Sequence, residues 1–202
     1  MQSENLDIFD FDGTLIRVNS FREINKRLLV KLLAKFKLLS FLRLSIWYFI
    51  RKTGIISHMD FKIKAVAIFE RSLSEDEKAG IVQGVVDQNL NQKVYEAMSQ
   101  SDNCIISTSA PYAYVSRMKL SDEASVISSL EPGDAYPDLS NFGQGKIDNV
   151  RAYFDGQNIS VRNTYTDSED DRPLIDLSEN AFIVKSGKIL KIKENGKSVD
   201  PA

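Results

Sequence analysis

The segment DIFDFDGTL, residues 7–15, constrains the fold of this chain more than any other stretch. Its apolar residues predict a strand, and that strand ends in two acids, Asp10 and Asp12, followed by Gly13. Side chains two positions apart on a strand share a face, so both carboxylates would project together from the strand's end. Carboxylates held so close raise each other's pKa unless a cation intervenes. An amphipathic edge strand that ends in an Asp-Gly turn is the simpler alternative, and this segment alone leaves it open.

Outside residues 20–90, strand-like and helical patterns alternate along the chain. This alternation predicts an α/β fold with a mainly parallel sheet. The predicted strands are NCIIST (103–108), ASVISSL (124–130), ISVRNTYT (159–166) and two short strands about a Ser-Gly turn in AFIVKSGKILKI (181–192). The predicted helices between them are NQKVYEAMSQ (91–100), PYAYVSRMKL (111–120), KIDNVRAYF (146–154) and a short one within SEDDRPLIDLS (168–178).

From about Ser20 to Met98 the pattern is helical and the charge changes sign. Apolar residues recur at helical spacing as far as the RKTG break at 51–54, and Ser74 begins a further helix with Glu77 three residues on. Residues 22–64 hold eleven basic and two acidic residues, a net charge of +9, whereas the rest of the chain carries −11. We therefore expect two unlike domains: an α/β core of residues 1–18 and 90–202, and a helical domain of residues 19–89.

The composition is that of a globular protein in a reducing compartment. Hydrophobic residues make up 43% of the 202 residues and charged residues 27%, as in ordinary globular domains. The single cysteine, Cys104, excludes an internal disulfide and lies in a strand-like run, where a buried thiol is expected. The N-terminus lacks the basic and apolar regions of a signal peptide, and no apolar run approaches the length of a membrane span. These features predict a cytoplasmic protein.

Four polar groups of residues follow the predicted strands or begin the next helix. Asp10 and Asp12 follow the first strand, Ser107 the second and Asp167 a later one, while Lys146 begins a helix behind a GQG turn. Open α/β sheets bind ligands at the carboxyl ends of their strands. These side chains are therefore expected to meet in one crevice.

In these four places the sequence resembles the haloacid dehalogenase superfamily. DFDGT is similar to the first motif of that superfamily, IIST to the second, Lys146 to the third and TDSEDD to the fourth, in the same order along nearly the whole chain. The resemblance implies a Rossmann-like core, with the helical segment inserted after the first motif as a C1 cap. NSFRE (19–23) and RPLIDLSENAFIV (172–184) make the chain most similar to the subgroup IB enzymes, which include phosphoserine phosphatase and many bacterial relatives.

The resemblance implies a Mg²⁺-dependent phosphatase that works through an aspartyl-phosphate. Asp10 would be the nucleophile, and Asp12 would be the general acid and base. Mg²⁺ would be held by Asp10, by the backbone carbonyl of Asp12 and by Asp167, with Asp171 supporting the metal's waters or Lys146. An alternative for Asp167 and Asp171 is a helix N-terminus decorated with acids.

The same resemblance assigns the phosphate-binding residues. Ser107 would donate a hydrogen bond to the phosphoryl group, with Thr108 and Gly13 beside it, and Lys146 would neutralise its charge. Ser107 is preferred to Ser109 because it directly follows the apolar run of its strand. A solvated lysine at the start of a helix is the alternative for Lys146.

The same resemblance implies a small or conjugated phosphomonoester as the substrate. Phosphoserine phosphatase carries an acid nine residues after the nucleophile, and Asn19 stands there in this sequence, which disfavours phosphoserine. Asn19, Ser20 and Arg22 are candidate substrate contacts. The basic helical segment could attract an anionic substrate, lie on an anionic membrane, or pack its apolar face internally while its lysines keep it soluble.

Two other functions remain alternatives at this point. A phosphotransferase or mutase would use the same nucleophile, and a non-catalytic module would use the basic segment to bind a membrane or another anion. With a phosphate-transfer residue at all four motifs, we expect an enzyme and no nucleic-acid partner.

Overall fold

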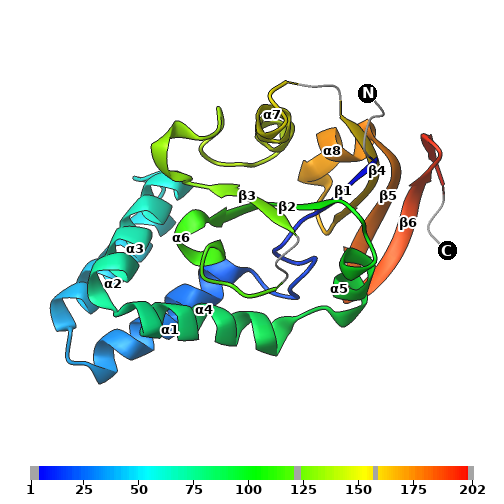
Figure 1. The fold of residues 1–202 in the computed structure, drawn as a ribbon. Coiled ribbons are helices and arrows are strands. Elements are labelled where there is room, and N and C mark those ends of the chain that lie inside the picture. Colours follow the sequence, from blue (N-terminus) through cyan, green and yellow to red (C-terminus); the bar gives the residue numbers. More distant parts are fainter. Residues whose placement is uncertain (1–4, 121–123, 157–158, 200–202) are drawn as a thin grey trace.

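A seven-stranded sheet forms the centre of the molecule. The computed structural model describes residues 5–120, 124–156 and 159–199, and the strand order within them is β3-β2-β1-β4-β5-β6-β7 (Figure 1). The strands are β1 (Asn5–Phe9), β2 (Cys104–Pro111), β3 (Ser125–Ser129), β4 (Ser160–Thr166), β5 (Ser178–Lys185), β6 (Lys188–Glu194) and β7 (Lys197–Ser198).

Five of these strands are parallel, which confirms the predicted Rossmann-like α/β class. β3, β2, β1, β4 and β5 pair in parallel, and β6 and β7 extend the sheet in antiparallel fashion. The predicted pair of strands about Ser-Gly is the β5–β6 hairpin. Its turn residues Ser186 and Gly187 have φ values of 50° and 76°, the left-handed conformation that a two-residue hairpin turn needs.

Helices cover both faces of the sheet. Figure 1 shows α7 and α8 above the sheet and α5 and α6 below it. Their bounds are α5 (Gln92–Ser99), α6 (Tyr112–Val115), α7 (Gln144–Tyr153) and α8 (Arg172–Leu177), with 3₁₀ turns η1 (Pro132–Asp134) and η2 (Glu169–Asp171). The helix predicted over 111–120 is only one turn long, because β2 continues to Pro111 and the N–H groups of Arg117 and Met118 bond three residues back instead of four.

Successive side chains of β1 point alternately into two hydrophobic cores, one on each face of the sheet. Leu6 and Ile8 pack in a core that includes Ile147 and Val150 of α7 and Leu174 of α8. Phe9 belongs to the core on the opposite face, which includes residues of α5 and α6. Because β1 is buried on both sides at the centre of the sheet, its carboxyl end is held firmly in place.

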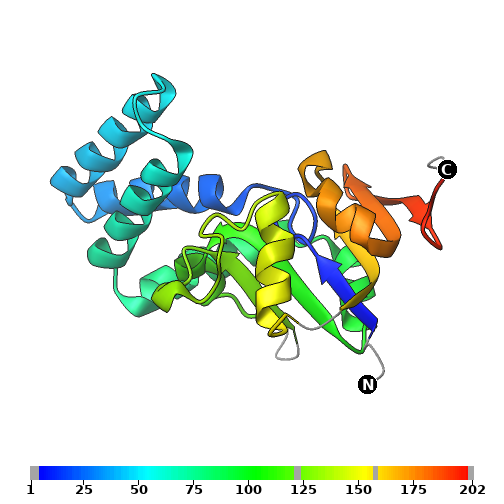
Figure 2. The same cartoon turned by 90° about the horizontal axis from the view of Figure 1, so that it is seen from above.

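Four helices between β1 and the rest of the sheet form a separate lobe, which we call the helical insertion (residues 20–89). It stands to the left of the sheet in both Figure 1 and Figure 2. Its helices are α1 (Ser20–Ala34), α2 (Leu38–Lys52), α3 (His58–Ser72) and α4 (Glu75–Asn89). α4 begins with the predicted capping box of Ser74 and Glu77, and the predicted break at 51–54 is present.

The chain also breaks where the apolar spacing predicts a continuous helix. α1 ends at Ala34, and α2 begins at Leu38 after Phe36 adopts a φ of 53°. A residue whose backbone has this left-handed conformation cannot continue a right-handed α-helix, so α1 and α2 are separate helices that fold back on each other.

Candidate active site

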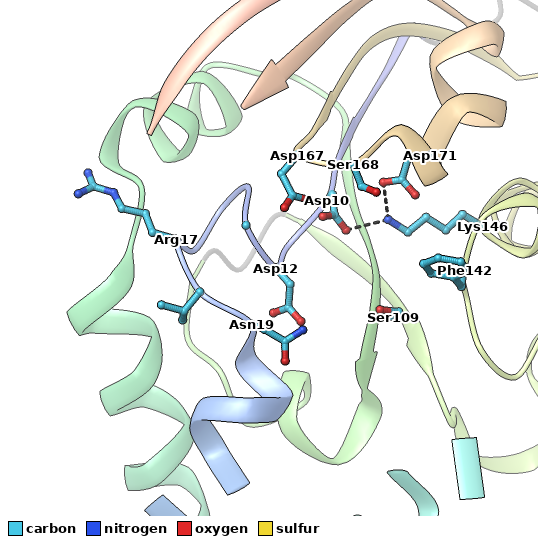
Figure 3. A pocket seen from close by; sticks show the side chains of 12 residues that line it. Asp10, Asp12, Arg17, Asn19, Ser109, Phe142, Lys146, Asp167, Ser168 and Asp171 are labelled. Carbon is cyan, nitrogen blue, oxygen red and sulfur yellow. Dashed lines mark hydrogen bonds and ion pairs between the residues drawn. The ribbon is translucent and has the colours of Figure 1, made fainter. Parts of the chain in front are cut away.

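The carboxyl ends of the central strands supply most of the predicted site residues. β1 ends at Phe9, so Asp10 and Asp12 lie in the loop beyond the strand and not on it, which corrects the strand-face prediction. Asp167 directly follows the neighbouring strand β4, Asp171 ends the η2 turn beyond it, and Lys146 lies in the first turn of α7. These segments border one cavity of about 360 Å³ (Figure 3).

The structure brings most of the sequence-predicted residues to this cavity. Asp10, Asp12, Gly13, Asn19, Lys146, Asp167 and Asp171 line it, together with Ser109, Phe142, Arg17, Val18 and Ser168. The backbone of Ser20 reaches its edge, and Arg22 lines a second cavity within the helical insertion. Ser107 and Thr108 line neither of these two cavities.

Lys146 joins two of the acids. Its Nζ donates to Asp10 Oδ1 and to Asp171 Oδ2, both at 2.7 Å (Figure 3). Asp171 Oδ2 also accepts from Thr166 Oγ1. All three charged groups are buried. Burial tends to lower the pKa of Lys146, but the two carboxylates outweigh it and raise that pKa, so the lysine is firmly charged. It is therefore not the solvated lysine of the alternative interpretation.

Asp10 is held in an environment that resists its ionisation. Burial raises its pKa to about 7, Lys146 opposes this shift, and the negative charges of Asp171 and Asp12 add to it. Four carboxylates line the cavity against two basic side chains, so the site carries an excess of negative charge. An additional cation in the cavity would relieve this excess.

Asp12 turns away from Asp10 towards the start of the helical insertion. Its Oδ1 accepts a 2.8 Å hydrogen bond from the backbone N–H of Ser20, the first residue of α1. Burial raises the pKa of Asp12 to about 6, against the opposing effects of the Ser20 hydrogen bond and the positive charge of Lys62. An acid with this pKa can both give and accept a proton near neutral pH.

Gly13 allows Asp167 to approach Asp10. Its φ of 79° favours glycine, and a Cβ at this position would collide with the Asp167 carboxylate. Burial raises the pKa of Asp167, while a hydrogen-bonding contact with the Asp10 side chain lowers it. The DFDGT segment thus both supplies acids and makes room for the acid that follows β4.

The two carboxylates of Asp10 and Asp167 fit a magnesium ion. In the described part of the chain, no group of three or more histidine, cysteine, aspartate or glutamate side chains could hold a metal alone. Mg²⁺ does not need such a group, because it is commonly bound through one or two carboxylates and keeps several waters. An acid pair beside an open cavity with surplus negative charge has the right donor chemistry.

The predicted phosphate ligand Ser107 needs correction. Ser107 and Thr108 are fully buried within β2, where Ser107 Oγ contacts Asn141 Nδ2 at 3.3 Å and Thr108 Oγ1 accepts from the backbone of Ala110. Neither lines the cavity, whereas Ser109 does (Figure 3). The strand continues to Pro111, so the end of the apolar run is not the end of the strand.

Lys62 is a site residue that the sequence did not single out. It belongs to α3 of the helical insertion and is 5% exposed. Its Nζ donates at 2.7 Å to the carbonyl of Ser109, which connects the insertion to the cavity wall. Burial lowers the pKa of Lys62 and the negative charge of Asp12 opposes this shift, so the two groups influence each other. In the sequence, Lys62 stands beside the apolar helical face of Phe61, Ala65 and Phe69, and this position could have indicated that the lysine is buried.

A parallel sheet with an acid-rich cavity and a buried lysine at its carboxyl edge defines an α/β protein with the site chemistry of a phosphate-transfer enzyme. The sequence model of the haloacid dehalogenase-like hydrolases matches residues 8–176. The chain therefore belongs to that family, which confirms the predicted superfamily and an enzyme of the hydrolase class.

Two solved structures are similar to this one. A protein of unknown function from Bordetella pertussis Tohama I has a TM-score of 0.63 and 16% identity over 86% of each chain. A phosphoserine phosphohydrolase-like protein from Francisella tularensis subsp. tularensis SCHU S4 has a TM-score of 0.48 and 16% identity over 88% of this chain and 85% of that chain. No curated protein matches the sequence. The Bordetella structure supports the fold.

Proposed function

We propose that this protein is a Mg²⁺-dependent phosphatase that hydrolyses a small phosphomonoester. The observation that carries the proposal is the convergence of Asp10, Asp167, Asp171 and Lys146 on one cavity, with Asp12 at its edge. Under this proposal residues 1–18 and 90–202 form the catalytic core, and residues 19–89 form a C1 cap over it.

Asp10 acts as the nucleophile. One carboxylate oxygen attacks phosphorus, the bond from phosphorus to the leaving oxygen breaks, and an aspartyl-phosphate forms. Lys146 lies 2.7 Å from Asp10 Oδ1, so its positive charge favours the ionised carboxylate and offsets the charge of the phosphoryl group. Ser109, in place of Ser107, donates to a phosphoryl oxygen.

Asp12 moves the protons. In its neutral form it protonates the leaving alkoxide, and as the resulting carboxylate it takes a proton from the water that hydrolyses the aspartyl-phosphate. The carboxyl group is restored and inorganic phosphate leaves. A pKa of about 6 suits both halves of this cycle, and the Ser20 N–H keeps the side chain in position.

Asp10, Asp167 and the backbone carbonyl of Asp12 would hold the metal. Bound Mg²⁺ supplies positive charge that favours ionised Asp10 and stabilises the negative charge on the phosphoryl oxygens. Asp171 acts indirectly, because its carboxylate is engaged with Lys146 and Thr166 and fixes the lysine.

The leaving group of the substrate occupies the second cavity, of about 610 Å³, between α1, α2 and α3. This cavity shares Asn19 with the first, and its wall combines apolar rings with basic side chains, among them Phe21, Tyr48, Phe61, Arg22 and Arg51. A phosphomonoester with an apolar part and a further negative charge fits this lining. Asn19 is engaged as the N-cap of α1 and is neutral, which disfavours an amino group in the substrate such as that of phosphoserine.

Hydrolysis of a generic aryl phosphate with and without EDTA tests the proposal. We expect inorganic phosphate to be released, chelation to stop the reaction and excess Mg²⁺ to restore it. Phosphorylated isomers in place of inorganic phosphate would identify a mutase, and activity indifferent to chelation would contradict the metal assignment.

A further inference from the structure

Exposed hydrophobic side chains are concentrated on the helical insertion. Eleven of the fifteen large hydrophobic side chains exposed in the described part of the chain lie between residues 30 and 63. The α1–α2 turn carries the most exposed of them, Phe36, at 85%. Exposed apolar patches mark interaction sites in soluble proteins, so the arrangement of these side chains on each helix decides whether they form one.

Helix α2 is apolar on two opposite faces. Its inner face holds Leu44, the one buried residue of the helix, and Tyr48, which lines the second cavity. The outer face is the apolar stripe, which we define as Leu39, Leu42, Ile46 and Phe49, with exposed fractions of 64%, 53%, 53% and 67%. The intervals of three, four and three residues place these side chains in one row along the helix. The alternative in which the insertion packs its apolar face internally therefore does not hold for this face.

The surroundings of the apolar stripe are positively charged. Residues 24–59 contain eight basic residues and no acid, and three of the eight, Lys26, Lys31 and Lys35, pair with Glu23 or Glu77. Arg43 is exposed beside the stripe and forms no ion pair with any residue that the structure describes. Basic side chains that flank an apolar helical face are the pattern of a helix that lies in a membrane interface.

We propose that the apolar stripe docks the protein peripherally on an anionic lipid surface. The stripe enters the boundary between headgroups and acyl chains, and Arg43 and its basic neighbours contact the lipid phosphates. No helix among the described residues is long and apolar enough to cross a membrane, so the contact is with one leaflet. A second copy of the chain is a poorer occupant, because a symmetric contact along the stripe would bring the Arg43 side chains that flank the stripe in both copies towards each other.

The single tryptophan of the chain, Trp47, is on α2 next to Ile46 of the stripe, and its ring packs partly on the core beneath Lys64 Nζ. The experiment measures co-sedimentation and Trp47 fluorescence with vesicles of phosphatidylcholine, with and without phosphatidylglycerol, including brominated acyl chains that quench tryptophan. We expect binding and quenching only with phosphatidylglycerol, and weaker binding at high salt. Binding is measured without turnover, so it is independent of the proposed phosphatase activity.

Two pairs of matched variants separate the stripe from the rest of the surface. Ile46→Glu and Leu139→Glu change side chains of similar exposure, 53% and 51%, and only Ile46 lies on the stripe. Loss of apolar burial and the added negative charge should weaken vesicle binding roughly a hundredfold in Ile46→Glu, with Leu139→Glu unchanged. Arg43→Gln should weaken binding about fivefold, whereas Arg151→Gln, an exposed arginine on α7, should not.

Thermal unfolding and aryl-phosphate hydrolysis should be unchanged in Ile46→Glu, because this side chain faces outwards and lines neither cavity. The proposal is overturned by a lack of binding to anionic vesicles, by equal binding to neutral ones, or by equal losses in Ile46→Glu and Leu139→Glu. If the protein does not bind vesicles and forms a dimer that Ile46→Glu dissociates, the stripe would instead be the contact with a second copy of the chain.

Discussion

Replacing Asp10, the proposed nucleophile, with its neutral analogue asparagine should make the metal-free protein more stable. Asp10 is buried, and its pKa is raised from the usual 3.8 to about 7, chiefly by burial and against the attraction of Lys146. Raising a pKa by one corresponds to about 1.4 kcal/mol, so ionised Asp10 lowers the free energy of unfolding by at most about 4 kcal/mol. Asp10→Asn removes this cost, and the amide oxygen can still accept a hydrogen bond from Lys146.

The effect of Asp10 depends on pH in a defined direction. Between pH 3.8 and about 7 the folded protein keeps a proton on Asp10 that the unfolded chain has lost. The free energy of unfolding therefore falls as pH rises through this window and levels off above it. The difference in stability between Asp10→Asn and the unaltered protein should thus be small near pH 4 and largest near pH 8.

Urea denaturation in EDTA, at several pH values across this window, measures the difference directly. Adding Mg²⁺ should stabilise the unaltered protein and have a much smaller effect on Asp10→Asn, which should also lack turnover. The reasoning would be refuted if Asp10→Asn were less stable than the unaltered protein at pH 8 in EDTA. A folded Asp10→Asn protein with normal turnover would overturn the assignment of the nucleophile.

Two further changes test how the cavity is built. Gly13→Ala should displace Asp167, because a Cβ at position 13 collides with the Asp167 carboxylate. The Mg²⁺ concentration that gives half-maximal activity should therefore rise roughly tenfold. An unchanged Mg²⁺ titration would contradict this role for Gly13. Ser109→Ala should lower kcat/KM about tenfold or more, because a donor to the phosphoryl group is lost. Ser107→Ala should lower the stability of the protein and leave kcat/KM of the folded protein unchanged. The opposite pattern in steady-state kinetics would restore Ser107 as the phosphate ligand.

Local sequence patterns were sufficient for the order of strands and helices along the chain outside the helical insertion. The buried strands alternate with helices along the chain, and the hairpin at Ser186 and Gly187 has a two-residue turn that sequence chemistry specifies. The break after α1 was not predictable in the same way. The apolar spacing continues through it, and the left-handed turn at Phe36 accompanies the packing of α2 on α3 and α1, which are tertiary contacts that the local pattern does not specify.

The site shows the same division between local and tertiary information. Asp10, Asp167 and Lys146 could be placed together because each lies where a strand ends or a helix begins, and parallel strands end at one edge. Ser109 was misjudged because the apolar run stops well before β2 does. Lys62 was missed because its contact with Ser109 joins residues 47 positions apart, on elements whose approach no local pattern encodes.

The hydrogen bond from the Ser20 N–H to Asp12 couples the pKa of Asp12 to the orientation of the helical insertion. α1 begins with that N–H group, and its far end leads into the turn that carries Phe36. If the lobe tilts away from the sheet to admit a ligand, Asp12 loses both its donor and its shielding from water, and becomes an ordinary carboxylic acid. Without burial its pKa falls towards the usual 3.8 and the group ionises at neutral pH, so opening the cavity would also remove the proton that the leaving group needs.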